Sequence, residues 1–333
     1  LKFANEHLVP VTPRGGGTGL SGGALPVNGG IVLSVERMNK ILNIDRKNFF
    51  VETESGVITQ NLQDELENIG LFYPVDPASR GSCFIGGNIA ENSGGPRALK
   101  YGVTKDYVLG LEFVTAQGEI INTGSKTLKN TTGYNLSQLI TGSEGTLGIV
   151  TKITLKILSK PKFRKLMLIA FDSVENCIEA VSEIFIEGVQ PSVLEFLEKS
   201  AVKATENHLG KPFPNSDAEA QLLVEVDGMS EELLYQQLQA VSDVAEKYNP
   251  SGMIVAEDNA KMEEIWALRR AVGEAVKSIC EYKEEDTVVP RYRMPELLKG
   301  VKEICQGYGI RAICYGHAGD GNLHINILRD KLS

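Results

Sequence analysis

A run of glycines near the start of the chain most constrains how it can fold. Residues 14–23 read Arg-Gly-Gly-Gly-Thr-Gly-Leu-Ser-Gly-Gly, so six of ten positions are glycine. Such a segment can bend tightly and turn its N–H groups toward one point, which favours a bound phosphate. The run contains Gly17-x-Gly19-x-x-Gly22, but a dinucleotide fingerprint must lead directly into a helix. Here turn residues and then the apolar run 31–35 follow. The sequence therefore predicts strand, loop, strand, with a diphosphate held by loop amides alone.

Length and composition favour two globular domains. The chain has 333 residues, which is large for a single hydrophobic core. A net charge of -9 argues against nucleic acid as a partner, and the lack of a long apolar run predicts a protein that is not integral to a membrane. The odd, scattered cysteines predict neither a disulfide framework nor a thiolate cluster, which favours the cytoplasm: Cys83, Cys177, Cys280, Cys305 and Cys314.

The two halves of the chain, which meet near residue 160, differ in glycine content and in the pattern of expected helices and strands. Residues 1–160 are rich in glycine and short strands, with one clear helix at 58–70, which predicts an α+β class. From residue 161 onward strands and amphipathic helices alternate, which predicts a sheet with helices packed on it. Strands are expected at 165–171, 193–197, 221–226, 253–257, 310–315 and 323–328, and helices at 173–188, 199–209, 231–248, 261–279 and 295–306.

Two further glycine-rich loops, 81–95 and 142–148, lie in the first half. One such loop alone is as easily structural as functional, because turns need glycine. Three of them favour a shared ligand over unrelated turns, since each glycine costs up to about 1 kcal/mol relative to alanine in a helix. A long ligand with several polar segments would need contacts of this kind.

Three stretches, 14–23, 76–95 and 142–151, resemble the FAD-binding domain of the vanillyl-alcohol-oxidase superfamily. Within it the chain is most similar, over almost its whole length, to the group of glycolate oxidase flavoprotein subunits, D-lactate dehydrogenases and D-2-hydroxyglutarate dehydrogenases. The resemblance implies a two-part FAD-binding domain at 1–160. It also implies a cap, or substrate, domain at 161–333 with a mainly antiparallel sheet covered by helices.

The resemblance also implies how FAD is bound. Residues 14–23 would wrap the diphosphate, 76–95 would line the isoalloxazine and ribityl parts, and 144–150 would reach the adenine end. FAD is expected to be non-covalent, because Thr18 stands where several relatives carry a linking histidine. The expected contacts are Arg14, Gly15, Gly16, Gly17, Thr18, Gly19, Ser21, Gly22, Asp76, Pro77, Gly81, Ser82, Gly86, Gly87, Asn88, Ala90, Asn92, Gly95, Gly102, Val103, Glu144, Gly145, Gly148 and Ile149.

A second motif, Gly-His-Ala-Gly-Asp-Gly-Asn-Leu-His, occupies residues 316–324. Asp-Gly between apolar strands predicts a two-residue hairpin turn at 320–321. With that turn His317 would face His324 across the ladder, and Asn326 would point to the same side. Two imidazoles this close could share Zn²⁺ or Mn²⁺, whereas the alternative is a pair of polar turn residues.

The motif is similar to the metal-binding and substrate-binding hairpin of the D-2-hydroxyacid dehydrogenases in this family. In that group a Glu and an active-site His from a later Glu-His-Gly segment complete the site. The 333 residues contain neither that segment nor the upstream strand pair with which the family begins. The chain as given is therefore expected to be impaired as a catalyst.

A substrate carboxylate needs a fixed cation, ideally an arginine fork. Arg269 and Arg291 are the candidates, and the resemblance places a substrate arginine at Arg269. Some relatives carry a substrate-contacting lysine where Glu284 stands here. This difference favours lactate or glycolate over 2-hydroxyglutarate. The neighbouring Lys283 leaves 2-hydroxyglutarate as an alternative substrate.

The expected function is the FAD-dependent oxidation of a short D-2-hydroxy acid, with His317, His324 and Arg269 as catalytic residues and Asn326 and Arg291 as further substrate contacts. Electrons would pass to a separate acceptor, an iron–sulfur subunit being one candidate, because the chain has no cysteine cluster. The expected location is the cytoplasm, with attachment to the inner membrane through that partner left open, as is a homodimer. The alternatives are an oxidase of another alcohol class on the same fold and a non-catalytic flavin-binding electron-transfer module.

Overall fold

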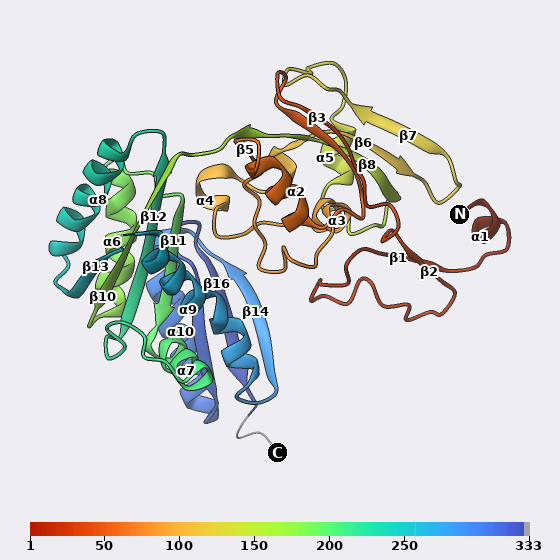
Figure 1. Cartoon of the computed structure of the whole chain (residues 1–333). Coiled ribbons are helices and arrows are strands. Elements are labelled where there is room, and N and C mark those ends of the chain that lie inside the picture. The colour runs from red at the N-terminus through yellow and green to blue at the C-terminus, as the bar shows by residue number, and fades with distance from the viewer. Residues whose placement is uncertain (257, 330–333) are drawn as a thin grey trace. The chain divides into compact units, whose positions relative to one another are not determined.

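The structure of the chain, a computed structural model, describes residues 1–256 and 258–329. The chain divides into two compact units, Leu1–Lys160 and Pro161–Ser333 (Figure 1). Mixed helix and strand in both units confirm the predicted α+β class.

The first unit is built on a five-stranded antiparallel sheet. Its strand order is β3 (Ile41–Asp45), β4 (Phe50–Glu54), β8 (Ile149–Lys156), β6 (Val108–Val114) and β7 (Ile120–Gly124). The core beneath this sheet combines apolar side chains of helices α2 (Thr59–Glu67) and α3 (Ile85–Glu91) with those of β8. Its shorter helices are α1 (Lys2–Glu6), α4 (Ala98–Tyr101), α5 (Leu136–Ile140) and the 3-10 turn η1 (Thr104–Asp106).

Two pairs of short strands complete this unit. β1 (Val11–Arg14) and β2 (Ile31–Ser34) run parallel, and β5 (Leu71–Phe72) pairs with β9 (Leu158–Ser159). The segment between β1 and β2 contains no helix. The predicted order of strand, glycine loop and strand is therefore confirmed.

The second unit is a seven-stranded sheet in which every pairing is antiparallel. The strand order is β13 (Pro250–Val255), β10 (Phe163–Phe171), β12 (Ala220–Gly228), β11 (Val193–Glu198), β15 (Arg311–His317), β16 (Asn322–Leu328) and β14 (Tyr282–Val288). Its helices are α6 (Val174–Ile186), α7 (Lys199–Leu209), α8 (Glu231–Glu246), α9 (Asn259–Lys277) and α10 (Met294–Tyr308), and η2 (Arg291–Arg293) is a 3-10 turn. Glu257, predicted to end the strand at 253–257, lies outside the described residues.

Helices cover both faces of this sheet, as Figure 1 shows for α6 and α8 on one side. The other face carries α7 and α9, whose apolar side chains form one core with Leu223 of β12, Leu197 of β11 and Tyr315 of β15. Because side chains alternate along a strand, residues in register with these three share the same face. This helix-covered face of the sheet, called here the α9 face, carries the histidine motif.

The sequence missed two elements of interest. β14 was not predicted, because its residues Tyr-Lys-Glu-Glu-Asp-Thr-Val are largely charged, as suits its place at the sheet edge. α3 was predicted as loop, because glycines in its first turn weaken the helical signal. No helix in the described part of the chain is both long enough and apolar enough to cross a bilayer.

Candidate functional site

The first glycine loop packs directly on the second. Gly16 lies so close to the Ser82 carbonyl oxygen that a methyl group on Gly16 would clash with that backbone atom. A methyl on Gly15 would lie 3.6 Å from Cα of Gly87. The parallel pairing of β1 and β2 holds both ends of the first loop at this position.

The third loop joins the other two through backbone hydrogen bonds. Gly142 N–H donates to the Ile89 carbonyl and Glu144 N–H donates to the Ala90 carbonyl, both at 2.9 Å. A methyl on Gly145 would lie 2.9 Å from Cγ of Pro13 in β1. All three loops therefore meet in the first unit, and their meeting point is called here the three-loop site.

This site offers unused donors and a cation. Among the described residues, no backbone N–H from 15 to 23 donates a hydrogen bond. The Arg14 side chain folds back over the loop. Its Nη2 lies so near Gly17 that a methyl on Gly17 would be only 2.6 Å away. Free amides beside a guanidinium form a donor set that fits a diphosphate. Glu91 also lies near Gly19, and burial together with the charge of Glu144 raises the pKa of Glu91.

Several other expected flavin contacts have structural partners of their own. Asn88 is buried and donates from Nδ2 to Oγ1 of Thr59 at 2.6 Å. Asp76 is buried beside Arg97, whose N–H it accepts at 3.3 Å. Asn92 ends α3 in a left-handed conformation, with φ of 51°. A methyl on any of four expected glycines would clash with neighbouring atoms: Gly86, Gly95, Gly102 and Gly148. These contacts within the fold therefore explain the residue types at these positions, whether or not the residues also contact FAD.

The hairpin in the second unit differs from its predicted register. The predicted turn at 320–321 would pair His317 with His324, but His317 pairs with Asn322 and His324 with Tyr315. The loop spans four residues, 318–321, and is held from outside the hairpin: Gly319 N–H donates to the Leu194 carbonyl of β11, and N–H of Val289, the residue after β14, donates to the Gly321 carbonyl. The pairing of His317 with His324 was therefore wrong.

Both histidines nevertheless lie on the α9 face, because a shift of two residues keeps side chains on the same side of a strand. Their ring centroids are 5.5 Å apart in an edge-to-face arrangement. Asn326, predicted to share this side, is buried there and donates from Nδ2 to the Ile313 carbonyl at 3.3 Å. The structure therefore places His317, His324 and Asn326 on one face as predicted, although through a different register.

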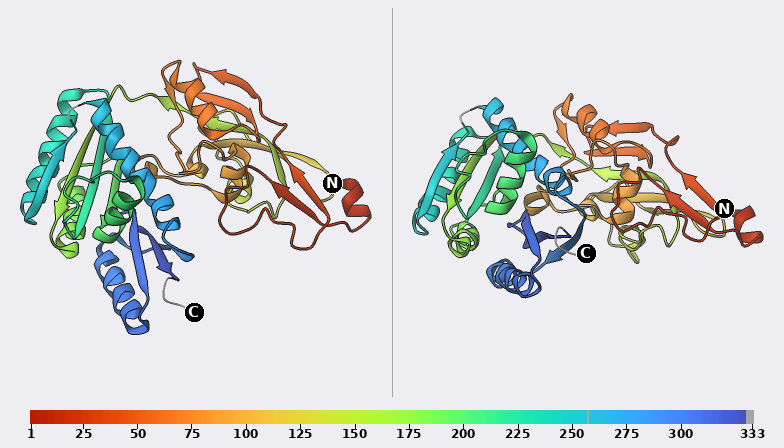
Figure 2. Two further views of the ribbon diagram at one scale, coloured as in Figure 1. Left: turned by 60° about the horizontal axis from the view of Figure 1, so that its bottom comes forward. Right: turned by 90° about the horizontal axis from the view of Figure 1, so that it is seen from below.

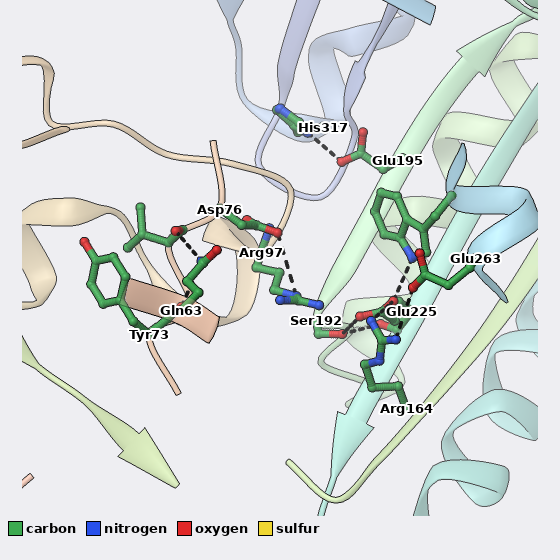
Figure 3. A network of polar contacts seen from close by, with 12 residues as sticks. Gln63, Tyr73, Asp76, Arg97, Arg164, Ser192, Glu195, Glu225, Glu263 and His317 are labelled. Atoms are coloured by element: carbon green, nitrogen blue, oxygen red, sulfur yellow. Dashed lines mark hydrogen bonds and ion pairs between the residues drawn. The ribbon is translucent and has the colours of Figure 1, made fainter. Parts of the chain in front are cut away.

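Glu195 is the residue that sequence reasoning missed. It lies on β11, fully buried, with Oε1 2.5 Å from His317 Nδ1; Figure 3 shows the two side chains pointing toward each other. Its Oε2 accepts hydrogen bonds from Nε and Nη2 of Arg269 on α9, the first at 2.8 Å. Burial alone would raise the pKa of Glu195, but its contacts with Arg269 and His317 lower it to about 2. Glu195 is therefore an anion throughout the neutral range.

His324 has acidic neighbours of its own on the edge strand β14. Its Nδ1 lies 3.0 Å from Oε1 of Glu284 and 3.8 Å from Oδ1 of Asp286. The contact with His324 lowers the pKa of Glu284, although burial acts in the opposite direction. Lys283 lies on the opposite face of β14, exposed and paired with Glu285.

The two predicted substrate arginines differ in position. Arg269 is 8% exposed and lies with its guanidinium carbon 5.1 Å from the ring centroid of Tyr315, on the α9 face. Arg291 instead lies 4.0 Å over the ring of Phe185 on α6. Among the described residues, no ion pair or hydrogen bond joins Arg291 to either histidine. The structure thus brings Arg269 together with the histidine motif, whereas the Arg291 side chain packs on Phe185 of α6.

A metal site is less complete than the motif implied. Across residues 1–256 and 258–329, no group of three or more His, Cys, Asp or Glu side chains has a geometry that could hold a metal ion. The donors at hand are the two imidazoles of His317 and His324, each with its Nδ1 against a carboxylate. Metal-bound histidines commonly have such a carboxylate partner, but a catalytic zinc usually has three protein ligands.

Comparison with known proteins decides the family. A model described as the FAD binding domain matches residues 1–124, and one described as the C-terminal domain of FAD linked oxidases matches residues 160–333. The chain belongs to the FAD-linked oxidase family. As an FAD-linked oxidase it is 41% identical to D-lactate dehydrogenase of Anaerostipes hadrus over 98% of its length. It is also 41% identical to glycolate oxidase subunit GlcD of Bacillus subtilis (strain 168) over 97%. It spans 70% and 69% of these two relatives.

Other members and solved structures extend this picture. The FAD-linked oxidase is 32% identical to D-2-hydroxyglutarate dehydrogenase of Stutzerimonas stutzeri (strain A1501) over 99% of its length and 71% of that relative. Among solved structures it resembles alkyldihydroxyacetonephosphate synthase, with a TM-score of 0.77 at 21% identity, covering 98% of this chain and 67% of that one. It also resembles p-cresol methylhydroxylase, with a TM-score of 0.78 at 16% identity, covering 100% of this chain and 72% of that one. At such identities the likeness describes the fold, which agrees with the predicted FAD-binding and cap architecture.

Proposed function

We propose that this FAD-linked oxidase oxidises a short D-2-hydroxy acid, such as glycolate or D-lactate, to the corresponding 2-oxo acid. The observation that carries the proposal is the buried carboxylate of Glu195, which ties the cation Arg269 to His317 on the face that also holds His324. A hydroxy acid needs both kinds of group, a cation for its carboxylate and polar side chains for its hydroxyl. The similarity to proteins named D-lactate dehydrogenase and glycolate oxidase subunit supports the same class.

FAD would be held non-covalently in the first unit. The unused amides of residues 15–23 and the Arg14 guanidinium would bind its diphosphate, and the facing loops at 81–95 and 142–148 would border the rest of the molecule. Bound FAD supplies the acceptor for the hydride that leaves C2 of the substrate. The protein contributes binding, orientation and electrostatics.

Residues of the α9 face would orient the substrate. Arg269 would bind the carboxylate; two of its nitrogens are fixed by Glu195, and Nη1 has no hydrogen bond within the described chain. His317 and His324 would contact the hydroxyl, with Asn326 beside them. Arg291 is a weaker candidate for substrate binding, because its guanidinium stacks on Phe185.

A divalent metal, Zn²⁺ or Mn²⁺, is a further part of this proposal. His317 and His324 would be its protein ligands among the described residues, fewer than the three that a catalytic zinc usually has. No step of the proposed reaction is assigned to the metal.

Electrons would leave through a separate acceptor, for which an iron–sulfur subunit is one candidate. The word subunit in the name of the GlcD relatives supports such an assembly. A cytoplasmic location, attachment to the inner membrane through that partner, and a homodimer belong to the same proposal and need separate experiments.

The test is product formation by the FAD-loaded protein with an artificial dye as electron acceptor. D-lactate should give pyruvate and reduce the dye in equal amounts. L-lactate should react at least about tenfold more slowly, as expected when one enantiomer leaves a binding group unpaired. Absence of 2-oxo acid from both D-lactate and glycolate, in protein shown to contain FAD, would contradict the proposal.

A further inference from the structure

Glu195 occupies a place in the fold where a charge is unexpected. It is the third residue of β11, and all six residues of that strand are buried. β11 lies inside the sheet between β12 and β15, where a strand normally carries apolar side chains toward both helix layers. Taking a carboxylate out of water is unfavourable by several kcal/mol before its partners compensate.

The partners of Glu195 are the two side chains already assigned to substrate. Its Oε1 faces Nδ1 of His317 at 2.5 Å, and its Oε2 accepts from Nε and Nη2 of Arg269. Each carboxylate oxygen therefore holds a different group. The ring of Tyr315 in β15 lies against the Arg269 guanidinium, whose central carbon is 5.1 Å from the ring centroid.

Stability alone does not explain this arrangement. A buried ion pair can often be replaced by apolar residues of similar size without loss of stability. What such a network does provide is a fixed geometry, since two long side chains are held by one rigid strand. An imidazole that donates Nδ1–H to a carboxylate must present its other nitrogen, Nε2, as an acceptor when the ring is neutral.

We propose that Glu195 is the positioning residue of this site. It keeps the proton of neutral His317 on Nδ1, leaves Nε2 toward the substrate hydroxyl, and locks Arg269 in the orientation that receives the substrate carboxylate. The second half of this statement rests on the proposed function. The first half concerns a property of the free protein.

The neighbouring strand provides a matched control. Glu225 on β12 is also fully buried and lies on the same α9 face. Its Oε2 accepts from Nε1 of Trp266 at 2.8 Å, so it too contacts α9, and it also lies 3.8 Å from Nη1 of Arg164. Glu225→Gln therefore reproduces the loss of a buried charge without touching His317 or Arg269.

The first experiment is ¹⁵N NMR of the histidine side chains at about pH 9, where imidazoles are neutral unless strongly perturbed. With four histidines in the chain, the signals can be assigned by substitution. His317 should show the Nδ1–H tautomer in the wild type and in Glu225→Gln, and should lose it in Glu195→Gln. A wild-type His317 in the Nε2–H tautomer would overturn the proposal whether or not any variant folds.

The second experiment measures steady-state oxidation of D-lactate by the FAD-loaded variants. Glu195→Gln should lower kcat and raise KM, with kcat/KM falling about 10- to 100-fold, the range typical of lost orienting carboxylates. Glu195→Asp should recover part of the loss, and Glu225→Gln should stay within about twofold of wild type. Equal effects of Glu195→Gln and Glu225→Gln would contradict the positioning role. An inactive wild type with the expected tautomer would contradict the proposed function instead.

Discussion

At the residue scale, the face of the strand decides what a side chain can do. Glu284 and Lys283 are neighbours in β14, but Glu284 is in register with Asn326 on the α9 face, whereas Lys283 pairs with Ile327 on the other face. From the sequence, Lys283 remained a candidate contact for a second substrate carboxylate. The register places Lys283 on the face opposite the two histidines. Glu284 lies on their face, and its negative charge disfavours a substrate with a second carboxylate.

Replacing Glu284 should change substrate preference. Glu284→Lys reverses a charge 3.0 Å from His324, so a second carboxylate on the substrate should be attracted where it was repelled. We expect the ratio of kcat/KM for D-malate to that for D-lactate to rise about tenfold, equivalent to about 1.4 kcal/mol. Steady-state kinetics on both substrates measures this ratio.

Lys283→Ala is the control for that prediction, because Lys283 is the adjacent residue and lies on the opposite face. It should leave the substrate ratio unchanged. A ratio that moves equally in both variants, or in neither, would contradict the placement of Glu284 beside the substrate.

Glu195 could not have been predicted from its local sequence. Its partners Arg269 and His317 are 74 and 122 residues away along the chain. A glutamate between apolar residues in a strand pattern is the only local signal, and Glu225 gives the same signal although it contacts Trp266. Arg269 itself was found through family resemblance and through the need for a cation, and the structure places it beside the histidine motif.

At the element scale, hydrophobic periodicity predicted the helices whose ends are determined by local interactions. α7 begins and ends at the predicted residues, and α6 starts after Ser173, whose hydroxyl accepts the N–H of Asn176 at 3.2 Å as an N-cap. The register of the histidine hairpin was predicted wrongly because hydrogen bonds with Leu194 and Val289, both outside the hairpin, hold its loop. Turn residues alone therefore indicated the hairpin but not its length.

The glycines of the three-loop site provide an element-scale prediction. In Gly16→Ala the new methyl would clash with the Ser82 carbonyl, so the first two loops would have to separate. Such overpacking disturbs a site by about 1–3 kcal/mol, so the Kd for FAD should rise about 5- to 100-fold. Quenching of flavin fluorescence on binding gives the Kd.

Gly300→Ala on α10 is the control, since a methyl on Gly300 would have no atom within 4 Å and Gly300 lies outside the three-loop site. Its FAD affinity should equal that of the wild type. Unfolding curves of both FAD-free variants separate a local change from a loss of fold. A folded Gly16→Ala protein that binds FAD normally would argue against the three-loop site as the diphosphate site.

At the scale of the whole molecule, each unit carries a different part of the proposed chemistry. The first unit brings together three loops that are far apart in the sequence, with free amides and an arginine. The second unit carries a seven-stranded sheet whose α9 face holds a buried Glu, an Arg and two His residues (Figure 2 shows both units from two sides). The motifs predicted which residue types take part. Only the fold showed which of them share a face.

The most direct test of the account is anaerobic reduction of the FAD-loaded protein by D-lactate, followed through the visible absorbance of oxidised flavin. If C2 of the substrate delivers a hydride to FAD, the band should disappear with D-lactate. It should also disappear several-fold more slowly when C2 carries deuterium, because the C2 bond breaks in the step observed. A band that persists with D-lactate and with glycolate, in protein that demonstrably holds FAD, would contradict the account.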